Sequence, residues 1–184
     1  AAVVDFAQTV GVNAFTQTDG TTSTTFNGLL TATGNVDFTG EALTFNGNGD
    51  NTVGGTLEVT NAGVFTTADA AELTVNGAFT QNGAGNSVIG DDVTSTTGAI
   101  AFGTAVQLSS TDLITMQTGE GAGDDLTITG NLSSALNESL TIDAGAAGDI
   151  DIDGTVQLNG GDLTITDAAV VDFAQTVGVN AFTQ

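Results

Sequence analysis

Short segments in which apolar and polar residues alternate recur along the whole chain. The clearest are residues 43–45, 57–60, 73–75, 126–129, 140–143 and 163–166. In each of them Leu, Val, Ile or Phe alternates with threonine or another polar residue. Alternation with a period of two, rich in β-branched residues, is the signal of a half-buried β-strand. The pattern therefore predicts an all-β protein made of many short strands.

The apolar positions also recur at a longer period of about 21 residues. One series is Phe6, Phe26, Phe45, Phe65, Val88, Leu108, Ile128, Ile150 and Phe173, and a second is Phe15, Val36, Leu57, Phe79, Ile100, Leu140 and Phe182. A repeat of this length is typical of a solenoid, in which each coil packs only against its neighbours. We therefore predict a parallel β-solenoid (β-helix) of about 21 residues per coil, with three short strands in each coil.

A much longer repeat is visible at the two ends of the chain. Residues 1–17 and 168–184 both read AAVVDFAQTVGVNAFTQ, at an offset of 167 residues. Either the chain is one period of a tandem array followed by the start of the next, or its two ends are built alike. We interpret residues 1–167 as one repeat unit of about eight coils. Residues 168–184 are then the start of a second unit.

Asn-Gly pairs follow several of the predicted strands, at 27–28, 46–47, 76–77 and 159–160. Asparagine and glycine both tolerate positive φ, so each pair suits a sharp corner. Asn-Gly also favours β-hairpins, and an antiparallel sandwich such as a bacterial immunoglobulin-like repeat is the alternative fold. The recurrence near 21 residues favours the solenoid. So does the absence of proline, which would remove a ladder hydrogen bond from an interior strand.

The composition excludes several classes of function. The 184 residues include 22 acidic side chains and no Lys, Arg, His or Cys, which gives a formal net charge of -22. We expect no binding of nucleic acid or of an anionic membrane surface, because both need cationic side chains. Nucleophilic systems that use His or Cys cannot be built, nor can imidazole or thiolate metal sites. No apolar run approaches the length of a membrane-spanning helix, so we expect no membrane insertion.

Several phrases resemble the repeats of very long bacterial surface proteins. They are VDFAQTVGVNAFTQ, GNVDFTGEALTFNG, GTLEVTNAGVFTT and DDLTITGNL. The similarity is to filamentous-haemagglutinin-like and autotransporter-like β-solenoids, and it covers nearly the whole chain. It implies an extracellular or cell-surface location and an adhesive, sheath or filament role. The lack of basic residues departs from that pattern, so binding functions that depend on basic patches are not carried over.

The sharpest local motif is Asp149-Ile150-Asp151-Ile152-Asp153-Gly154. Oxygen ligands at alternate positions followed by glycine resemble the opening of a calcium loop, so Asp149, Asp151 and Asp153 are candidate ligands for calcium or another divalent cation. The EF-hand pattern fails, because Gly160 stands where the closing Glu would be. The other interpretation is a plain strand with Ile150 and Ile152 inside and the three aspartates outside.

Three further patterns are weaker candidates. Residues 47–55 are similar to the glycine-rich calcium repeats of RTX proteins but occur once, which favours a turn. Asp91-Asp92 and Asp124-Asp125 are carboxylate pairs of the kind that glycoside hydrolysis needs, but they lack cationic or aromatic neighbours and also suit acidic corners. Threonine segments, at 22–24, 31–33, 127–129 and 164–166, suggest an ice-binding face, although they do not recur at every coil.

The charge and the repeats together favour a structural role. Eight coils at about 4.8 Å each span about 38 Å, which gives one acidic charge per ~1.8 Å of axis, close to the ~1.7 Å of duplex DNA. We expect the partners to be cations and further copies of the chain, with no required cofactor and no enzymatic activity. The predicted function is an extracellular filament, tether or sheath of tandem units. The alternative is an adhesin stalk or a calcium-organised binding module.

Overall fold

The computed structural model describes residues 2–19 and 22–184, and these residues form 26 β-strands and no helix. Sheet A contains β1 (Val3–Phe6), β4 (Ser23–Phe26), β7 (Leu43–Phe45), β10 (Phe65–Thr67), β13 (Ser87–Ile89), β16 (Val106–Leu108), β19 (Leu132–Ser134), β22 (Val156–Gln157) and β25 (Val177–Gly178). Sheet B contains β2 (Val10–Val12), β5 (Leu30–Ala32), β8 (Asn51–Val53), β11 (Leu73–Val75), β14 (Val93–Ser95), β17 (Ile114–Gln117), β20 (Leu140–Asp143), β23 (Leu163–Asp167) and β26 (Phe182–Thr183). Sheet C contains β3 (Phe15–Gln17), β6 (Val36–Gly40), β9 (Leu57–Asn61), β12 (Phe79–Gln81), β15 (Ile100–Phe102), β18 (Leu126–Ile128), β21 (Asp149–Ile152) and β24 (Val170–Phe173).

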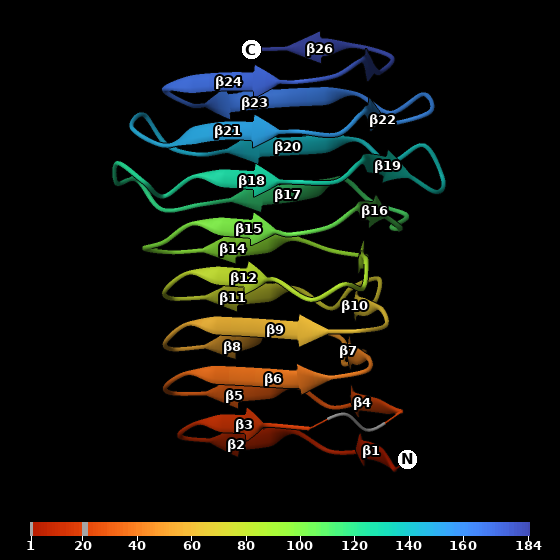
Figure 1. Ribbon diagram of the computed structural model, residues 1–184, viewed down its shortest axis with the longest axis vertical. Helices are drawn as coiled ribbons and strands as arrows, with labels where there is room; N and C mark the ends of the chain where they lie inside the picture. Colours follow the sequence, from red (N-terminus) through yellow and green to blue (C-terminus); the bar gives the residue numbers. More distant parts are fainter. Residues whose placement is uncertain (1, 20–21) are drawn as a thin grey trace.

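The chain visits sheets A, B and C in turn, and each strand pairs in parallel with the strand one coil later. The coils stack along one axis with the chain termini at opposite ends (Figure 1). Each coil therefore contains one strand of every sheet and about 21 residues. This arrangement confirms the predicted parallel β-solenoid and rules out the antiparallel sandwich. Residues 1, 20 and 21 lie outside the described residues, so the predictions that include them are not tested there.

The core follows from the alternation in the sequence. Most strands are three residues long, with the first and third side chains buried and the middle one facing outward. Phenylalanines fill the first half of the core. Ring contacts join Phe26, Phe45, Phe65, Phe79 and Phe102 in succession, with centroid separations of 5.2–6.1 Å, and each of these rings is at most 1% exposed. Leucine and isoleucine fill the core of the following coils.

The Asn-Gly corners have a different physical basis from the one predicted. Among the described residues, only the pair Asn159-Gly160 has positive φ, at 52° and 120°. At Gly28 and Gly47 any larger residue is excluded because its side chain would contact the backbone of the preceding coil. A Cβ at Gly47 would lie 2.8 Å from the carbonyl carbon of Gly28, and one at Gly28 would meet the backbone at Gln8. Glycine is needed there because successive corners stack directly on each other.

The asparagines of these corners form a ladder of side-chain hydrogen bonds. The Asn46 Nδ2 donates to Asn27 Oδ1 at 2.9 Å, and the Asn27 Nδ2 donates to Asp5 Oδ1 at 2.6 Å. The Asn27 amide therefore donates to the preceding coil and accepts from the following one. Stacked asparagine amides of this kind tie neighbouring coils together at the outer corner.

Coil length divides the solenoid into two regions. In residues 22–108, which we call the regular stack, paired residues of adjacent coils are 19–22 positions apart. In residues 109–148, which we call the long coils, the pairs Val106↔Leu132 and Ile114↔Leu140 are both 26 positions apart. The additional residues lie in loops that project beyond the strands near β17, β18 and β19 (Figure 1).

The long coils displace both apolar series, as the first one shows. Leu108 lies in sheet A and pairs with Ser134, whereas Ile128, the next member of the series, lies in sheet C. The series advances 20 residues from Leu108 to Ile128, but the coil there has 26 residues. Ile128 therefore lies in β18, one strand before the next strand of sheet A, β19. The first series therefore changes from sheet A to sheet C there, although Ile128 and Ile150 are still buried. The second series changes from sheet C at Ile100 to sheet B at Leu140.

This displacement also determines where the repeated segment lies. Residues 2–17 form β1, β2 and β3 in sheets A, B and C, whereas residues 169–184 contain β24, β25 and β26 in sheets C, A and B. In the described chain, β24 is the twenty-third strand after β1. At three strands per coil, the 167-residue offset spans seven and two-thirds coils, consistent with the predicted value of about eight. The identical segments therefore begin on different faces of the solenoid.

Candidate functional site

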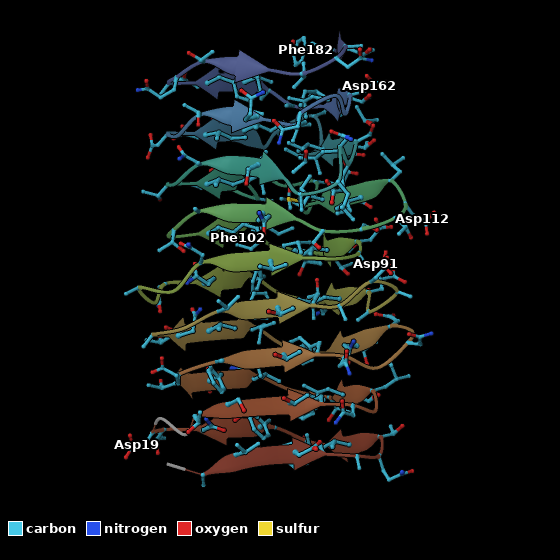
Figure 2. All side chains as sticks on the ribbon, turned by 90° about the vertical axis from the view of Figure 1, so that its right-hand side faces the viewer. Asp19, Asp91, Phe102, Asp112, Asp162 and Phe182 are labelled. Carbon is cyan, nitrogen blue, oxygen red and sulfur yellow. The ribbon has the colours of Figure 1, made fainter. Side chains whose placement is uncertain are left out.

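Acidic side chains gather along the corner where each coil passes from sheet A to sheet B. We call this corner the acidic edge. Its members are Asp50, Asp69, Glu72, Asp91, Asp92, Asp112, Glu138 and Asp162. Asp91, Asp112 and Asp162 project along one side of the stack in Figure 2. Because the carboxylates belong to successive coils, their charges form a ridge along the solenoid axis, where counter-ions accumulate.

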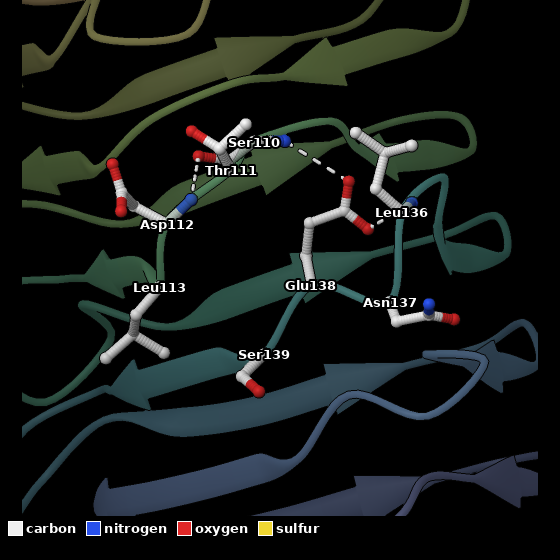
Figure 3. A pocket seen from close by; sticks show the side chains of 8 residues that line it. All are labelled: Ser110, Thr111, Asp112, Leu113, Leu136, Asn137, Glu138 and Ser139. Carbon is white, nitrogen blue, oxygen red and sulfur yellow. Dashed lines mark hydrogen bonds between the residues drawn. The ribbon is translucent and has the colours of Figure 1, made fainter.

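An open pocket of about 410 Å³ interrupts the acidic edge at the long coils (Figure 3). Two loops line it, residues 110–113 and 136–139. Glu138 lies between them and is only 4% exposed. Its carboxylate accepts hydrogen bonds from the backbone N–H groups of Ser110, at 3.2 Å, and Leu136, at 2.7 Å. The buried carboxylate therefore holds the two loops together, which is a structural role that the sequence pattern did not indicate.

Asp69, in the regular stack, supports the first of these loops. Its Oδ1 accepts a hydrogen bond from the Ser110 hydroxyl, and its Oδ2 accepts one from the Thr111 hydroxyl, both at 3.1 Å. Leu113 and Leu136, at the rim of the pocket, are 56% and 63% exposed. The pocket is thus a gap between two projecting loops, with apolar side chains at its rim and acidic groups at its base.

Glu72 lies where the acidic charges are most crowded. It follows Asp50 and precedes Asp92 at equivalent positions in three successive coils, each directly before a strand of sheet B. Burial raises the pKa of the Glu72 carboxyl, and the charges of Asp50, Asp92 and Asp91 raise it further. Burial also raises the pKa of Asp91, partly offset by the hydrogen bond that the Asp92 N–H donates to it. The sequence concealed this ladder, because it is visible only once the coil register is known.

The candidate calcium ligands lie on and beside β21. Ile150 and Ile152 are fully buried, so the strand interpretation of this motif is confirmed. Asp149 and Asp151 line a shallow pocket of about 240 Å³ together with Asp125 and Asp172. Asp153 follows the strand and is not part of that lining. The structure thus brings two of the three predicted ligands beside two carboxylates that the motif did not include.

The electrostatics of this pocket are dominated by repulsion. Asp151 lies opposite Asp172 in the next coil and opposite Thr127 in the previous one. Partial desolvation raises the pKa of the Asp151 carboxyl, and the charges of Asp153 and Asp172 raise it further. Within residues 2–19 and 22–184, no group of three or more carboxylates has an arrangement that could hold a metal ion. The calcium site at Asp149, Asp151 and Asp153 stays a prediction.

The carboxylate pairs considered for glycoside hydrolysis lie at corners. Asp91 and Asp92 precede β14 of sheet B, whereas Asp124 and Asp125 precede β18 of sheet C. Several of these carboxylates accept backbone N–H groups: Asp92 from Thr115 at 2.6 Å, Asp124 from Gly121 at 2.9 Å, and Asp125 from Asp149 at 2.9 Å. The contacts of Asp92 and Asp125 join neighbouring coils, and that of Asp124 closes its own loop.

The glycine-rich stretch at 47–55 likewise forms part of the solenoid framework. Its first residues make a corner in which Gly49 has a φ of 116°, and Asn51–Val53 is strand β8. The Asn51 side chain is buried, and its Oδ1 accepts the backbone N–H of Leu30 at 3.0 Å. The stretch is therefore a turn followed by a strand.

Threonines recur far more regularly than the sequence pattern suggested. In the described part of sheet B, every strand from β5 onward presents an outward threonine: Thr31, Thr52, Thr74, Thr94, Thr115, Thr141, Thr164 and Thr183. We call this row the threonine rank. The first four are in register with each other, as are the last four, and Thr94 pairs with Gln117 where the two groups meet. Varying coil length conceals the rank in the sequence.

The threonine rank is the most regular surface of the molecule. It forms two rows of four hydroxyls, each row with the spacing of neighbouring strands, about 4.8 Å, and the register shifts between Thr94 and Thr115. The acidic edge borders the rank along the same sheet, so the hydroxyl row lies beside a ridge of negative charge. Such a surface suits polar, repetitive partners or cations.

Comparison with known proteins gives no further assignment, because the chain matches no protein-family model, no curated protein and no solved structure at a significant level. A search of the described residues for membrane spans finds no helix long and apolar enough to cross a bilayer.

Proposed function

We propose that the chain is a structural repeat unit of an extracellular or cell-surface filament, tether or sheath, built from tandem β-solenoid units that continue end to end. The observation that supports this most strongly is the repeated segment. Residues 169–184 form strands that extend the stack by one more coil, with a sequence identical to that of residues 2–17. A unit that ends with the beginning of the next is suited to continuation.

The fold itself suits a load-bearing spacer. A β-solenoid repeat fits a structural repeat protein, because each coil is bonded to its neighbours by three parallel ladders along the same axis. The extracellular location comes from the resemblance to bacterial surface proteins and is part of the proposal. So is the absence of catalysis, which agrees with carboxylates committed to backbone N–H groups at the corners.

A second candidate is an adhesin stalk or a binding module on the cell surface. The threonine rank favours this alternative, since it offers a flat and repetitive polar surface on sheet B. Substitution of Thr52 and Thr74 by lysine would disrupt the rank without touching the core, because both side chains face outward. Loss of adhesion to cells or surfaces in this variant, with unchanged rod length, supports the stalk over a passive filament.

The test of the structural proposal is the length of chains with one, two and three 167-residue units. At about 4.8 Å per coil, each added unit lengthens the rod by about 37 Å. Small-angle X-ray scattering measures the maximum dimension directly. Stepwise growth by this amount supports a continuous spacer. Compact particles, or units that move independently, contradict it.

Cations are the other proposed partners. With 22 acidic groups and no basic ones, the solenoid repels itself, and divalent ions that bridge carboxylates stabilise the folded state by linkage. We expect the melting temperature to be higher in millimolar calcium than in chelator. Sodium chloride at equal ionic strength is the control for simple screening. Identical melting curves in all three conditions contradict the divalent-ion proposal.

A further inference from the structure

The C-terminal end of the solenoid is an open surface of strands and apolar side chains. Strands β24, β25 and β26 form this surface, and Phe173, Val177, Val179 and Phe182 line an open hollow of about 260 Å³ on it. Phe182, which lies at this end of the stack in Figure 2, is 48% exposed, whereas Phe26 and Phe45 in the regular stack are fully buried. The apolar core therefore continues to this end without cover.

We propose that this end surface binds a second copy of residues 22–38 of the same repeat as its next coil, and that each unit is thereby turned by one sheet relative to the unit before. The inference rests on the proposed tandem function and specifies its junction. The partner is chosen by identity: residues 169–184 have the sequence of residues 2–17, and residues 22–38 are what cover residues 2–17 in this structure.

The aromatic side chains of the end surface are already arranged for that partner. The rings of Phe6 and Phe15 are 6.0 Å apart with an interplanar angle of 82°, and those of Phe173 and Phe182 are 6.2 Å apart with an angle of 83°. Phe26 stacks on Phe6 at 4.7 Å and meets the edge of Phe15 at 5.4 Å. A second copy of Phe26 fits the same two faces on Phe173 and Phe182.

The polar groups of the end surface also correspond to those that residues 22–38 contact near the N-terminus. Near the N-terminus, Asn27 Nδ2 donates to Asp5 Oδ1 at 2.6 Å, and the Thr33 hydroxyl donates to Asn13 Oδ1 at 3.1 Å. The equivalent acceptors at the C-terminal end are Asp172 and Asn180. The Asn180 Nδ2 already donates to Asp162 in the coil below, which leaves its Oδ1 in position to accept from the coil above.

Electrostatics disfavours a partner made of residues 2–17 on this surface. Asp172 already lies opposite Asp151. In the same register, a copy of residues 2–17 would place Asp5 opposite Asp172 and make a row of three carboxylates. Residues 22–38 instead place Thr25 there, because Thr25 pairs with Asp5 in this structure. Like charges directly opposite on adjacent strands are destabilising, so the segment that ends the acidic row is preferred.

Because of this junction, each strand of the following unit lies in a different sheet from its counterpart in the first unit. A copy of β4 on β24 lies in sheet C, whereas β4 itself lies in sheet A. By the same displacement, the strands that carry the threonine rank move from sheet B to sheet A in the second unit and to sheet C in the third. Each surface feature returns to its original face after three units, a rise of about 110 Å at the usual strand spacing. The filament thus presents the same features in three directions.

The test uses a two-unit chain, residues 1–184 followed directly by another copy of residues 18–184. The introduced thiols are the only ones, because the chain contains no cysteine. In the test variant, Asp172→Cys is combined with Thr25→Cys in the second copy. Directly opposed residues on adjacent strands are within disulfide reach. We expect mild oxidation to remove both free thiols, to the same extent as in the benchmark Asp5→Cys/Thr25→Cys within the first copy.

Two matched controls test the register and the face. Asp172→Cys with Thr44→Cys in the second copy joins positions one coil too far apart, and Asp172→Cys with Thr31→Cys joins neighbouring sheets. Both controls should retain their thiols. Equal or better cross-linking in either control overturns the proposed junction. The proposed junction is also overturned if the test variant keeps its thiols while X-ray scattering shows a rod of full length. In that case the proposed spacer function is still supported. Two independent particles contradict both proposals.

Discussion

The regular stack and the long coils are made of the same strands but are held together differently. In the regular stack the coils differ little in length, and the core is a continuous row of phenylalanine rings. In the long coils the core is aliphatic, and buried hydrogen bonds such as those of Glu138 hold the projecting loops in place. Both regions contain buried side-chain hydrogen bonds, but those of the regular stack join coils of similar length, whereas those of Glu138 hold loops that extend beyond the strands.

The largest expected effect comes from removing a ring from the regular stack. Phe45→Ala deletes a fully buried side chain between Phe26 and Phe65 and should destabilise the protein by about 3–5 kcal/mol. The control is Leu113→Ala in the long coils, which shortens a side chain that is 56% exposed and should alter stability by less than about 0.5 kcal/mol. Urea unfolding measures both. Similar losses in the two variants would contradict the view that the buried ring row is a main source of stability.

A polar contact should matter most in the long coils. Glu138→Ala leaves the N–H groups of Ser110 and Leu136 without their carboxylate partner and should cost about 1.5–3 kcal/mol. Glu120→Ala, in an exposed loop of the same region, is the control for loss of a charge. Hydrogen exchange should speed up at residues 109–113 and 135–139 in the Glu138 variant alone. Unchanged exchange in these loops would show that the carboxylate does not anchor them.

Glycine substitutions should have a moderate effect where the added Cβ would meet the backbone of the neighbouring coil, as at Gly54 in the regular stack and at Gly130 in the long coils. A Cβ at Gly54 would lie 2.5 Å from the Thr33 carbonyl oxygen of the coil below, so Gly54→Ala should cost about 1–3 kcal/mol through overpacking. A Cβ at Gly121, in a long-coil loop, meets only the flexible side chain of Asp124. Gly121→Ala should therefore be the milder change in thermal denaturation. The reverse order would contradict the view that backbone contact with the coil below, and not the loss of glycine itself, determines the cost at Gly54.

The smallest effect expected is a dependence of stability on mildly acidic pH. The pKa of Glu72 and that of Asp151 are raised in the folded state, by desolvation and by neighbouring carboxylates, so the folded protein binds protons more readily than the unfolded chain. Stability should accordingly increase as pH falls from neutrality through the raised pKa values, and decrease again as pH rises through them. Glu72→Gln should flatten the profile of melting temperature against pH more than Glu120→Gln does. Equal profiles in the two variants would remove Glu72 as a cause.

The sequence was sufficient for the fold because its local signals agree with each other. Alternation in segments such as 43–45 and 163–166 predicts strands, and the same alternation places Ile150 and Ile152 inside. A period near 21 residues then predicts the stacking of coils. These features depend on neighbouring residues and an average spacing, which the sequence shows directly.

Features that depend on register between coils were not predictable. The threonine rank and the Asp50–Glu72–Asp92 ladder join residues whose separation changes with coil length. The role of Glu138 depends on the meeting of two loops of adjacent coils. The Asn-Gly corners were found correctly, but close stacking explains most of their glycines better than positive φ does.

The most direct test of the central claim is an electron cryomicroscopy structure of a chain with three consecutive 167-residue units. The account predicts one continuous solenoid, lengthened by about 37 Å per unit at the usual spacing of neighbouring strands. It also predicts that the three copies of the loop at residues 109–113 project from three different corners. Three copies of this loop on the same side, or three separate bodies joined by flexible linkers, would contradict it.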